Sequence, residues 1–134
     1  MVRRIYVEKK KGFDIEAQEL YEDLKENLQL KRLTSVRVMN RYDIEGIDDD
    51  TYEAAKYTIF AEPAIDWVYE ENVSIDKGSR FFAVEYLPGQ FDQRADSAEQ
   101  CIKLLNVNSE AVVRFARLIV LNGVISEEEF AAVK

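Results

Sequence analysis

Histidine is absent from this sequence of 134 residues, and cysteine occurs once, at Cys101. The lack of histidine removes the commonest general base and the commonest metal ligand, and it excludes Ser-His and Cys-His nucleophile pairs. A zinc site would have to combine one thiolate with carboxylates, which is an unusual ligand set. A single cysteine excludes an internal disulfide and fits a reducing cytoplasm. We therefore predict no catalytic residue and no metal site in this chain, and a cytoplasmic location.

Long apolar runs and an excess of basic residues are also missing. No apolar run approaches the ~20 residues that a membrane helix needs, and the start, MVRRIYVEKKK, lacks the apolar stretch of a signal peptide. The 18 basic and 26 acidic residues give a net charge of −8, whereas binding to phosphates needs a concentrated basic surface. We expect neither a membrane nor a nucleic acid as partner. The remaining composition, 47% hydrophobic and 33% charged, is typical of a globular domain.

Along the first half of the chain, segments in which apolar residues alternate are separated by segments with helical spacing of apolar residues. In RRIYVEKK, Ile5 and Val7 fall on one side, which is typical of a half-buried strand. Asp14 is then the expected N-cap of a helix whose apolar residues recur at i, i+3, i+4 and i+7. The same criteria predict a strand at 35–44, a helix at 47–60 and a short strand with Trp67 as a packing residue.

The second half repeats this order of elements. RFFAVEYL predicts a strand, a Pro-Gly pair breaks it, and Asp92 is the expected cap of an amphipathic helix. Cys101 falls on the apolar side of that helix, so we expect it to be a small core residue. AVVRFARLIVL predicts a central strand because it is apolar on both faces. Ser126 and Glu129 have the spacing of a capping box that starts the last helix.

The two halves align with each other after a shift of 78 residues. FDIEAQELYEDLK then lies over FDQRADSAEQCIK, and IDDDTYEAAK over ISEEEFAAVK. We interpret this as an internal duplication with a first unit at 1–71, a linker at 72–79 and a second unit at 80–134. The predicted fold class is α+β and two-layered. It has two related units with mainly antiparallel sheets, each covered by helices on one face, and a pseudo-twofold axis relates them.

The second unit stops earlier in this pattern than the first. Lys134 aligns with Lys56, which lies inside a predicted helix. Nothing in the second unit matches the strand that carries Trp67. We therefore expect the second unit to be truncated at its C-terminus, and the chain to be a fragment of a longer protein.

Two segments resemble families of purine biosynthesis. IYVEKKKGFDIEAQELYEDLKENL, followed by VRVMNRYDIEGI, is similar to the small PurS-type subunit. YLPGQFDQRADSAEQCIKLL resembles the N-terminal region of the large single-chain phosphoribosylformylglycinamidine synthases, in which a Pro-Gly turn leads into a Ser/Ala-rich helix that ends near a Cys. The resemblance covers nearly the whole chain. It implies PurS-like, ferredoxin-like-related units and a domain that mimics a dimer of the small subunit.

The resemblance also implies a role in an ATP-dependent ligase reaction. In that reaction, ammonia from glutamine replaces the amide oxygen of formylglycinamide ribonucleotide. The ATP and Mg²⁺ sites and the glutaminase cysteine belong to later domains, so no cofactor is expected in these 134 residues. The implied partners are the synthetase and glutaminase domains of the same enzyme, which this domain would bridge while helping to close the ammonia route. A homodimer of the chain is the other assembly that we consider.

The two units differ at the start of the first helix of each unit, directly after the capping aspartate. The second unit has Gln93 and Arg94 where the first has Ile15 and Glu16. An arginine at a helix start can form a bidentate contact with a carboxylate or a phosphate. We therefore take Gln93 and Arg94 as candidates for an interdomain or ligand contact, with a solvated arginine as the alternative.

The other candidate residues have structural roles in this interpretation. Pro88 and Gly89 are expected to set a turn, and a phosphate site on their backbone N–H groups is the less favoured alternative because no glycine-rich motif accompanies them. Asp92 and Asp14 are expected to cap helices, each cap contributing ~1 kcal/mol.

Two other classes of function remain open. One is a freestanding module, either a ferredoxin-like regulator that binds a small metabolite between its units or a PurS-like accessory subunit. The other is a direct enzyme, which ranks last because the chain offers so few acid–base groups.

Overall fold

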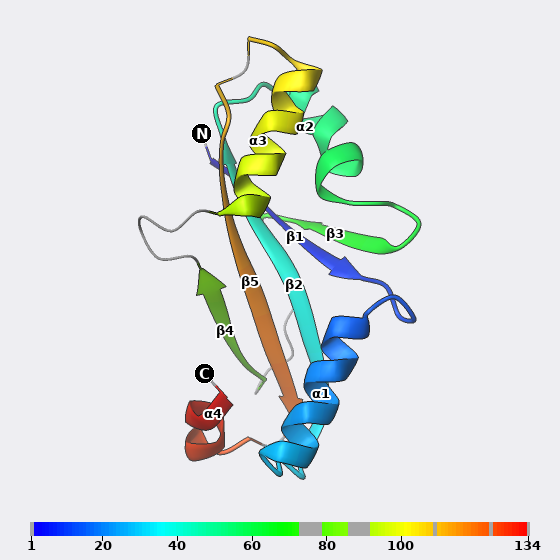
Figure 1. Cartoon of the computed structure of the whole chain (residues 1–134), viewed down its shortest axis with the longest axis vertical. Helices are drawn as coiled ribbons and strands as arrows, with labels where there is room; N and C mark the ends of the chain where they lie inside the picture. The colour runs from blue at the N-terminus through cyan, green and yellow to red at the C-terminus, as the bar shows by residue number, and fades with distance from the viewer. Residues whose placement is uncertain (1, 73–78, 86–91, 109, 124, 134) are drawn as a thin grey trace.

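The computed structural model describes residues 2–72, 79–85, 92–108, 110–123 and 125–133. Within these ranges the strands are β1 (Val2–Lys9), β2 (Leu33–Glu45), β3 (Asp66–Glu70), β4 (Arg80–Glu85) and β5 (Val112–Gly123). The helices are α1 (Ile15–Asn27), α2 (Asp49–Ala55), α3 (Gln93–Leu105) and α4 (Glu127–Val133), and α2 continues into a π-helical turn, η1 (Lys56–Phe60). The described strands form one sheet in the order β3-β1-β2-β5-β4, with every neighbouring pair antiparallel (Figure 1).

β2 and β5 form the longest pairing of the sheet and join its two halves. Their register runs from Leu33 opposite Gly123 to Glu45 opposite Val112. The predicted α+β class with antiparallel strands is therefore right, but both halves share one sheet instead of forming one sheet each. The physical reason lies in β5, which is apolar on both faces and needs a strand on each side. β2 and β4 supply those two neighbours.

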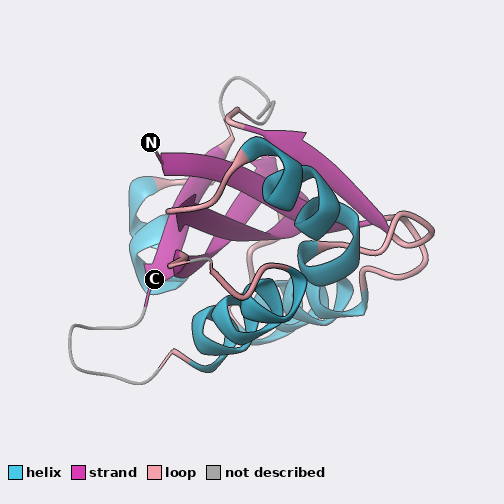
Figure 2. Cartoon of the chain, turned by 90° about the horizontal axis from the view of Figure 1, so that it is seen from above, coloured by secondary structure: helices cyan, strands magenta, loops and turns pink. Residues whose placement is uncertain are grey.

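The helices cover one face of the sheet, as predicted. Alternate side chains of β1, β2 and β5 point to this face and meet the helices there. Ile5, Ile44 and Ile102 are fully buried in the part of the core under α2 and α3, and Leu33 and Leu121 in the part near α1 and α4. Figure 2 shows the twist of the sheet and most of the helical chain on one side of it.

The opposite face of the sheet carries a small apolar cluster made of Met39, Leu118 and Val120, with Tyr6 and Tyr69 against it. Trp67 lies on β3, at the edge of the sheet, and 52% of its surface is exposed. The ammonium of Lys10 stands 4.5 Å from the centroid of its ring. The prediction that Trp67 is a packing residue is therefore wrong, because an edge strand leaves it without a neighbour on one side.

The helix starts follow the sequence prediction in part. At α4 the capping box is present: the Ser126 N–H donates to Glu129 Oε1 at 3.0 Å, and the Glu129 N–H donates to Ser126 Oγ at 3.1 Å. Ile125 and Phe130, on either side of this box, pack in the same cluster. The helix predicted at 47–60 is less regular than expected, since its second half is the π-helical turn.

The helix pairs repeat along the chain. α3 and α4 begin and end 78 residues after α1 and α2, which is the shift that aligns the two halves of the sequence. Two related units would produce this spacing, and they would also place β2 beside β5 at the centre of the sheet. The duplication itself and its boundaries at 1–71, 72–79 and 80–134 stay predictions.

Candidate functional site

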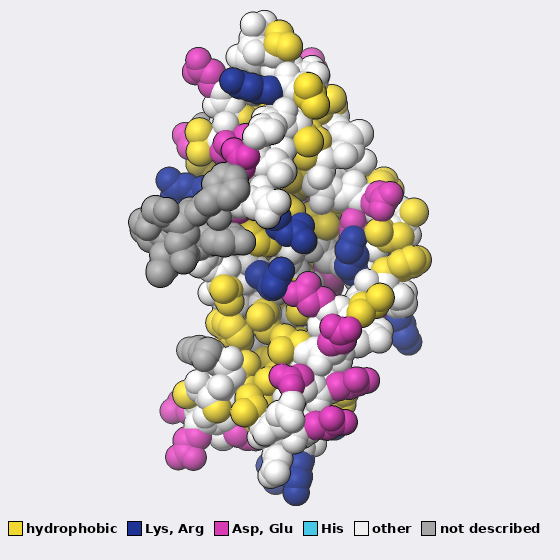
Figure 3. Space-filling view, viewed as in Figure 1, with side chains coloured by type: hydrophobic (Ala, Val, Ile, Leu, Met, Phe, Trp, Pro, Cys, Tyr) yellow, Lys and Arg dark blue, Asp and Glu magenta, His cyan; other side chains and the backbone are white. Residues whose placement is uncertain are grey.

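A cleft lies on the helix-covered face of the sheet, between the start of α1 and the start of α3 (Figure 3). It has an inner chamber of about 250 Å³ and an outer chamber of about 460 Å³. Tyr42, Ile59, Phe60 and Arg94 line both chambers, so the two are continuous. We call them together the central cleft. Figure 3 shows Lys and Arg side chains gathered in this hollow.

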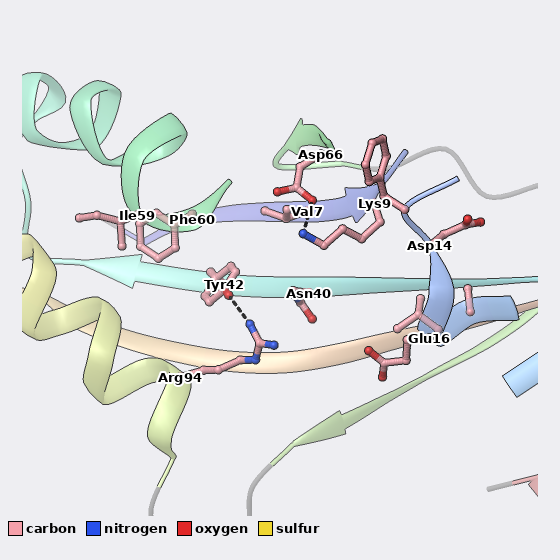
Figure 4. A pocket seen from close by; sticks show the side chains of 13 residues that line it. Val7, Lys9, Asp14, Glu16, Asn40, Tyr42, Ile59, Phe60, Asp66 and Arg94 are labelled. Atoms are coloured by element: carbon pink, nitrogen blue, oxygen red, sulfur yellow. Dashed lines mark hydrogen bonds and ion pairs between the residues drawn. The ribbon is translucent and has the colours of Figure 1, made fainter. Parts of the chain in front are cut away.

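Strands form the floor of the inner chamber, and two helix starts and the end of η1 form its walls. Asn40 and Tyr42 both point into the chamber from β2, because alternate residues of a strand face the same side (Figure 4). Glu16 enters from the second position of α1, and Arg94 from the second position of α3. Glu16 and Arg94 occupy equivalent positions in the two halves of the sequence, and both therefore line the same cavity.

Arg94 is the cation of the cleft whose charge is least compensated within the described residues. Its Nη1 donates to the hydroxyl of Tyr42 at 3.5 Å, and its Cζ lies 5.3 Å from the ring centroid of Phe115. The described residues include no carboxylate in an ion pair with it. Tyr42 is only 5% exposed, so Arg94 holds its charge beside a buried hydroxyl and an aromatic ring.

Most of the other charged side chains at the inner chamber are paired, whereas Asp14 forms no ion pair within the described residues. Lys9 Nζ lies 3.0 Å from Asp66 Oδ1, and the second oxygen of Asp66 accepts the Glu62 N–H at 2.8 Å. Arg117, whose strand lies beside the chamber floor, binds Glu16 with Nη1 at 2.9 Å from Oε1. These pairs nearly cancel one another in the field of the cleft, which leaves two charges without an ionic partner among the described residues: the guanidinium of Arg94 at the α3 end and the carboxylate of Asp14 at the α1 end.

The outer chamber is lined from α3 by Gln93, Ser97, Ala98 and Cys101. Cys101 is exposed there, so the prediction that it is a core residue is wrong. The apolar side of α3 that faces the sheet is centred on Ala95, Ala98 and Ile102, and Cys101 lies at its border. A position at the border of an apolar stripe is one that helical spacing alone assigns poorly.

The predicted caps behave differently in the two helices. Asp92 Oδ1 accepts the Ala95 N–H at 3.0 Å, which is the expected cap of α3. Asp14 stands at the N-cap position of α1 but makes no side-chain cap: its Oδ1 accepts the Gly12 N–H at 3.2 Å and the Gln18 side chain at 2.8 Å. The prediction of a cap at Asp14 is wrong because the tight turn at Gly12 draws the carboxylate away from the helix.

Pro88 and Gly89, predicted to set the turn before α3, lie outside the described residues. No sequence pattern marked Tyr42 as a cleft residue. Its place in an alternating strand indicated a core side chain, and the body of Tyr42 is indeed buried. Its contact with Arg94 joins residues 52 positions apart, which no local pattern encodes.

A second polar group, separate from the cleft, surrounds Lys56. This lysine is only 8% exposed and forms ion pairs with Glu53 at 3.1 Å and with Glu70. The hydrogen bond to Glu70 raises the pKa of Lys56, against the opposing effect of burial. Burial, helped by the charge of Glu70, raises the pKa of the neighbouring Tyr52 to about 12. This arrangement ties η1 to β3, and we assign it a structural role.

The comparisons with known proteins add no relationship: no protein-family model, no curated protein and no solved structure matches the chain. Among the described residues, no group of three or more Cys, Asp or Glu side chains is arranged to hold a metal ion. None of the helices in the described ranges has the length and apolar character to cross a membrane. The outer chamber, by contrast with the α1 end of the inner one, has no carboxylate in its lining and places the guanidinium of Arg94 beside the Tyr42 hydroxyl, which suits the binding of an anion there.

Proposed function

We propose that this chain is a non-catalytic bridging module of the PurS-like type that acts in the cytoplasm. The enzyme it serves in this proposal is a phosphoribosylformylglycinamidine synthase, of which the chain is the N-terminal structural domain. That enzyme amidates formylglycinamide ribonucleotide in de novo purine biosynthesis, using ATP and glutamine. Its synthetase and glutaminase domains are the proposed partners, and they carry the ATP, Mg²⁺ and glutaminase sites.

One observation carries the proposal: a segment that resembles those synthases, YLPGQFDQRADSAEQCIKLL, belongs to a chain whose helix pairs repeat at a spacing of 78 residues. A module that mimics a dimer needs two equivalent halves joined by a central strand pair. The long antiparallel pairing of β2 with β5 supports this arrangement. A bridging role also agrees with a cleft that offers hydrogen-bond donors and no histidine-activated nucleophile.

Co-purification tests this proposal. The tagged chain is mixed with a synthetase–glutaminase chain of the family that lacks its own N-terminal domain, and the two are expected to elute together. Arg94→Ala is expected to weaken the association, whereas Arg114→Ala, which removes an exposed arginine of β5 away from the cleft, is the matched control. The proposal is wrong if the two chains never associate, or if the isolated chain itself turns over glutamine or ATP.

A freestanding regulatory module is the second candidate, and the central cleft favours it. A cleft between the starts of α1 and α3, with one arginine that lacks a carboxylate partner among the described residues, is a suitable place for a small metabolite. Under this function the isolated chain binds the metabolite and has no affinity for the synthetase–glutaminase chain.

A further inference from the structure

We propose that the central cleft binds a small organic monocarboxylate, with the carboxylate on Arg94 and Tyr42 and the apolar part of the ligand against Ile59, Phe60 and Ala98. The inference goes beyond the bridging role and does not rest on it. It is argued from the donors that converge in the cleft, from the pairing of the other cations, and from the size and lining of the outer chamber.

The donors at the centre of the cleft are mostly unused within the described residues. A guanidinium has five N–H donors, and the polar contact made by Arg94 there is the long one to the Tyr42 hydroxyl. Because that hydroxyl accepts from Arg94, its own proton is left to donate, and no described group accepts it. A buried tyrosine hydroxyl and a guanidinium that both donate toward one space are complementary to the two oxygens of a carboxylate.

The charges around the cleft favour a monoanion over a phosphate dianion. The ammonium of Lys9 is neutralised by Asp66, and the guanidinium of Arg117 by Glu16. A dianion in the cleft would therefore face one uncompensated cation, Arg94, and the carboxylates at the α1 end of the inner chamber would repel it about twice as strongly as they repel a monoanion. A monocarboxylate needs one charge only, and Arg94 supplies it.

The outer chamber sets the size and character of the rest of the ligand. Its volume of about 460 Å³ lies within the usual range of small-molecule pockets, roughly 300–1,000 Å³. Ile59, Phe60 and Ala98 give it an apolar wall, and Gln93 and Ser97 add polar groups. An aromatic or branched aliphatic group beside the carboxylate fits this lining.

Benzoate is the probe for this inference, with benzamide as its neutral counterpart and inorganic phosphate as the dianion. Binding is measured by NMR from the Nε–H signal of Arg94 and the amide signals of Ser97 and Ala98. A fragment of this size is expected to bind with a Kd on the order of 1 mM. Cys101, the only thiol in the chain, lines the outer chamber, so slower alkylation of Cys101 in the presence of benzoate is an independent readout.

Three variants locate the binding. Arg94→Gln removes the charge at similar length and is expected to weaken benzoate binding about tenfold or more. Tyr42→Phe removes only the hydroxyl and is expected to weaken it about threefold to tenfold. Arg114→Gln makes the same charge change on an exposed part of β5 and is expected to leave the affinity unchanged.

Several outcomes would overturn the inference. They are the absence of benzoate binding to the wild-type chain, equal affinity in the Arg94→Gln variant, equal affinity for benzamide, and tighter binding of phosphate than of benzoate. A circular dichroism spectrum of each variant shows that it is folded. Since the bridging role is tested by co-purification and this site by benzoate binding to the isolated chain, either can fail while the other holds. If the Arg94→Ala change weakens co-purification while benzoate never binds, Arg94 is a docking residue and the ligand site is refuted.

Discussion

Replacement of Gly123 by alanine tests the junction that makes the two halves one sheet. Gly123 ends β5 opposite Leu33 of β2 and has φ +120°, a conformation that costs a residue with a side chain about 1 kcal/mol or more. A Cβ there would overlap the carbonyl oxygen of Arg32 and lie 2.9 Å from the Thr34 N. Since both are backbone atoms, β2 and β5 must separate at this point, and we expect the loss of local hydrogen bonds to add about 2 kcal/mol.

The total of about 3 kcal/mol corresponds to a fall in Tm of roughly 10 °C for a chain of this length. Thermal unfolding followed by circular dichroism measures it. Gly12→Ala is the matched control: Gly12 also has a positive φ, +95°, but nothing lies within 4 Å of the added Cβ. We expect that variant to lose only about 1 kcal/mol, or roughly 3 °C. Equal losses of Tm in the two variants would show that the close approach of β2 to Gly123 is not present.

Two further predictions concern the helix starts and the buried tyrosine. Asp92→Ala removes the hydrogen bond from the Ala95 N–H and is expected to lower the free energy of unfolding by about 1 kcal/mol. Asp14→Ala removes no cap and should lower it by less. Urea unfolding measures both variants, and equal losses would contradict the difference in capping. Burial and the charge of Glu70 raise the pKa of Tyr52 to about 12. The neutral form of Tyr52 therefore stabilises the fold below the ordinary tyrosine pKa of about 10. This contribution to the free energy of unfolding is lost as the pH rises from about 10 to 12. The ultraviolet phenolate signal that disappears in Tyr52→Phe should titrate near 12, and a midpoint near 10 would contradict the burial.

Much of the fold follows from local patterns in the sequence. Ile5 and Val7 alternate on β1, and both are buried on the predicted face. Ser126 and Glu129 form the capping box that their spacing indicated. These features depend on residues a few positions apart, which is the range over which hydrophobic periodicity and capping act.

What the sequence could not show depends on contacts between distant residues. The exposure of Trp67 follows from the place of β3 at the sheet edge, which strand pairing decides. The site was found in part: Arg94 stood out by comparison of the two halves, but its neighbour Tyr42 comes from another strand of the sheet. Cys101 shows the limit of helical spacing, because a small shift in the angle of a helix moves a border residue from the core to the surface.

The most direct test of the proposed function is the glutamine-dependent activity of a phosphoribosylformylglycinamidine synthase that lacks its N-terminal domain. If this chain bridges the synthetase and glutaminase domains and helps to close the ammonia route, adding it should raise the glutamine-dependent rate and leave the rate with free ammonia nearly unchanged. A glutamine-dependent rate that stays the same at saturating amounts of the folded chain would contradict the bridging role.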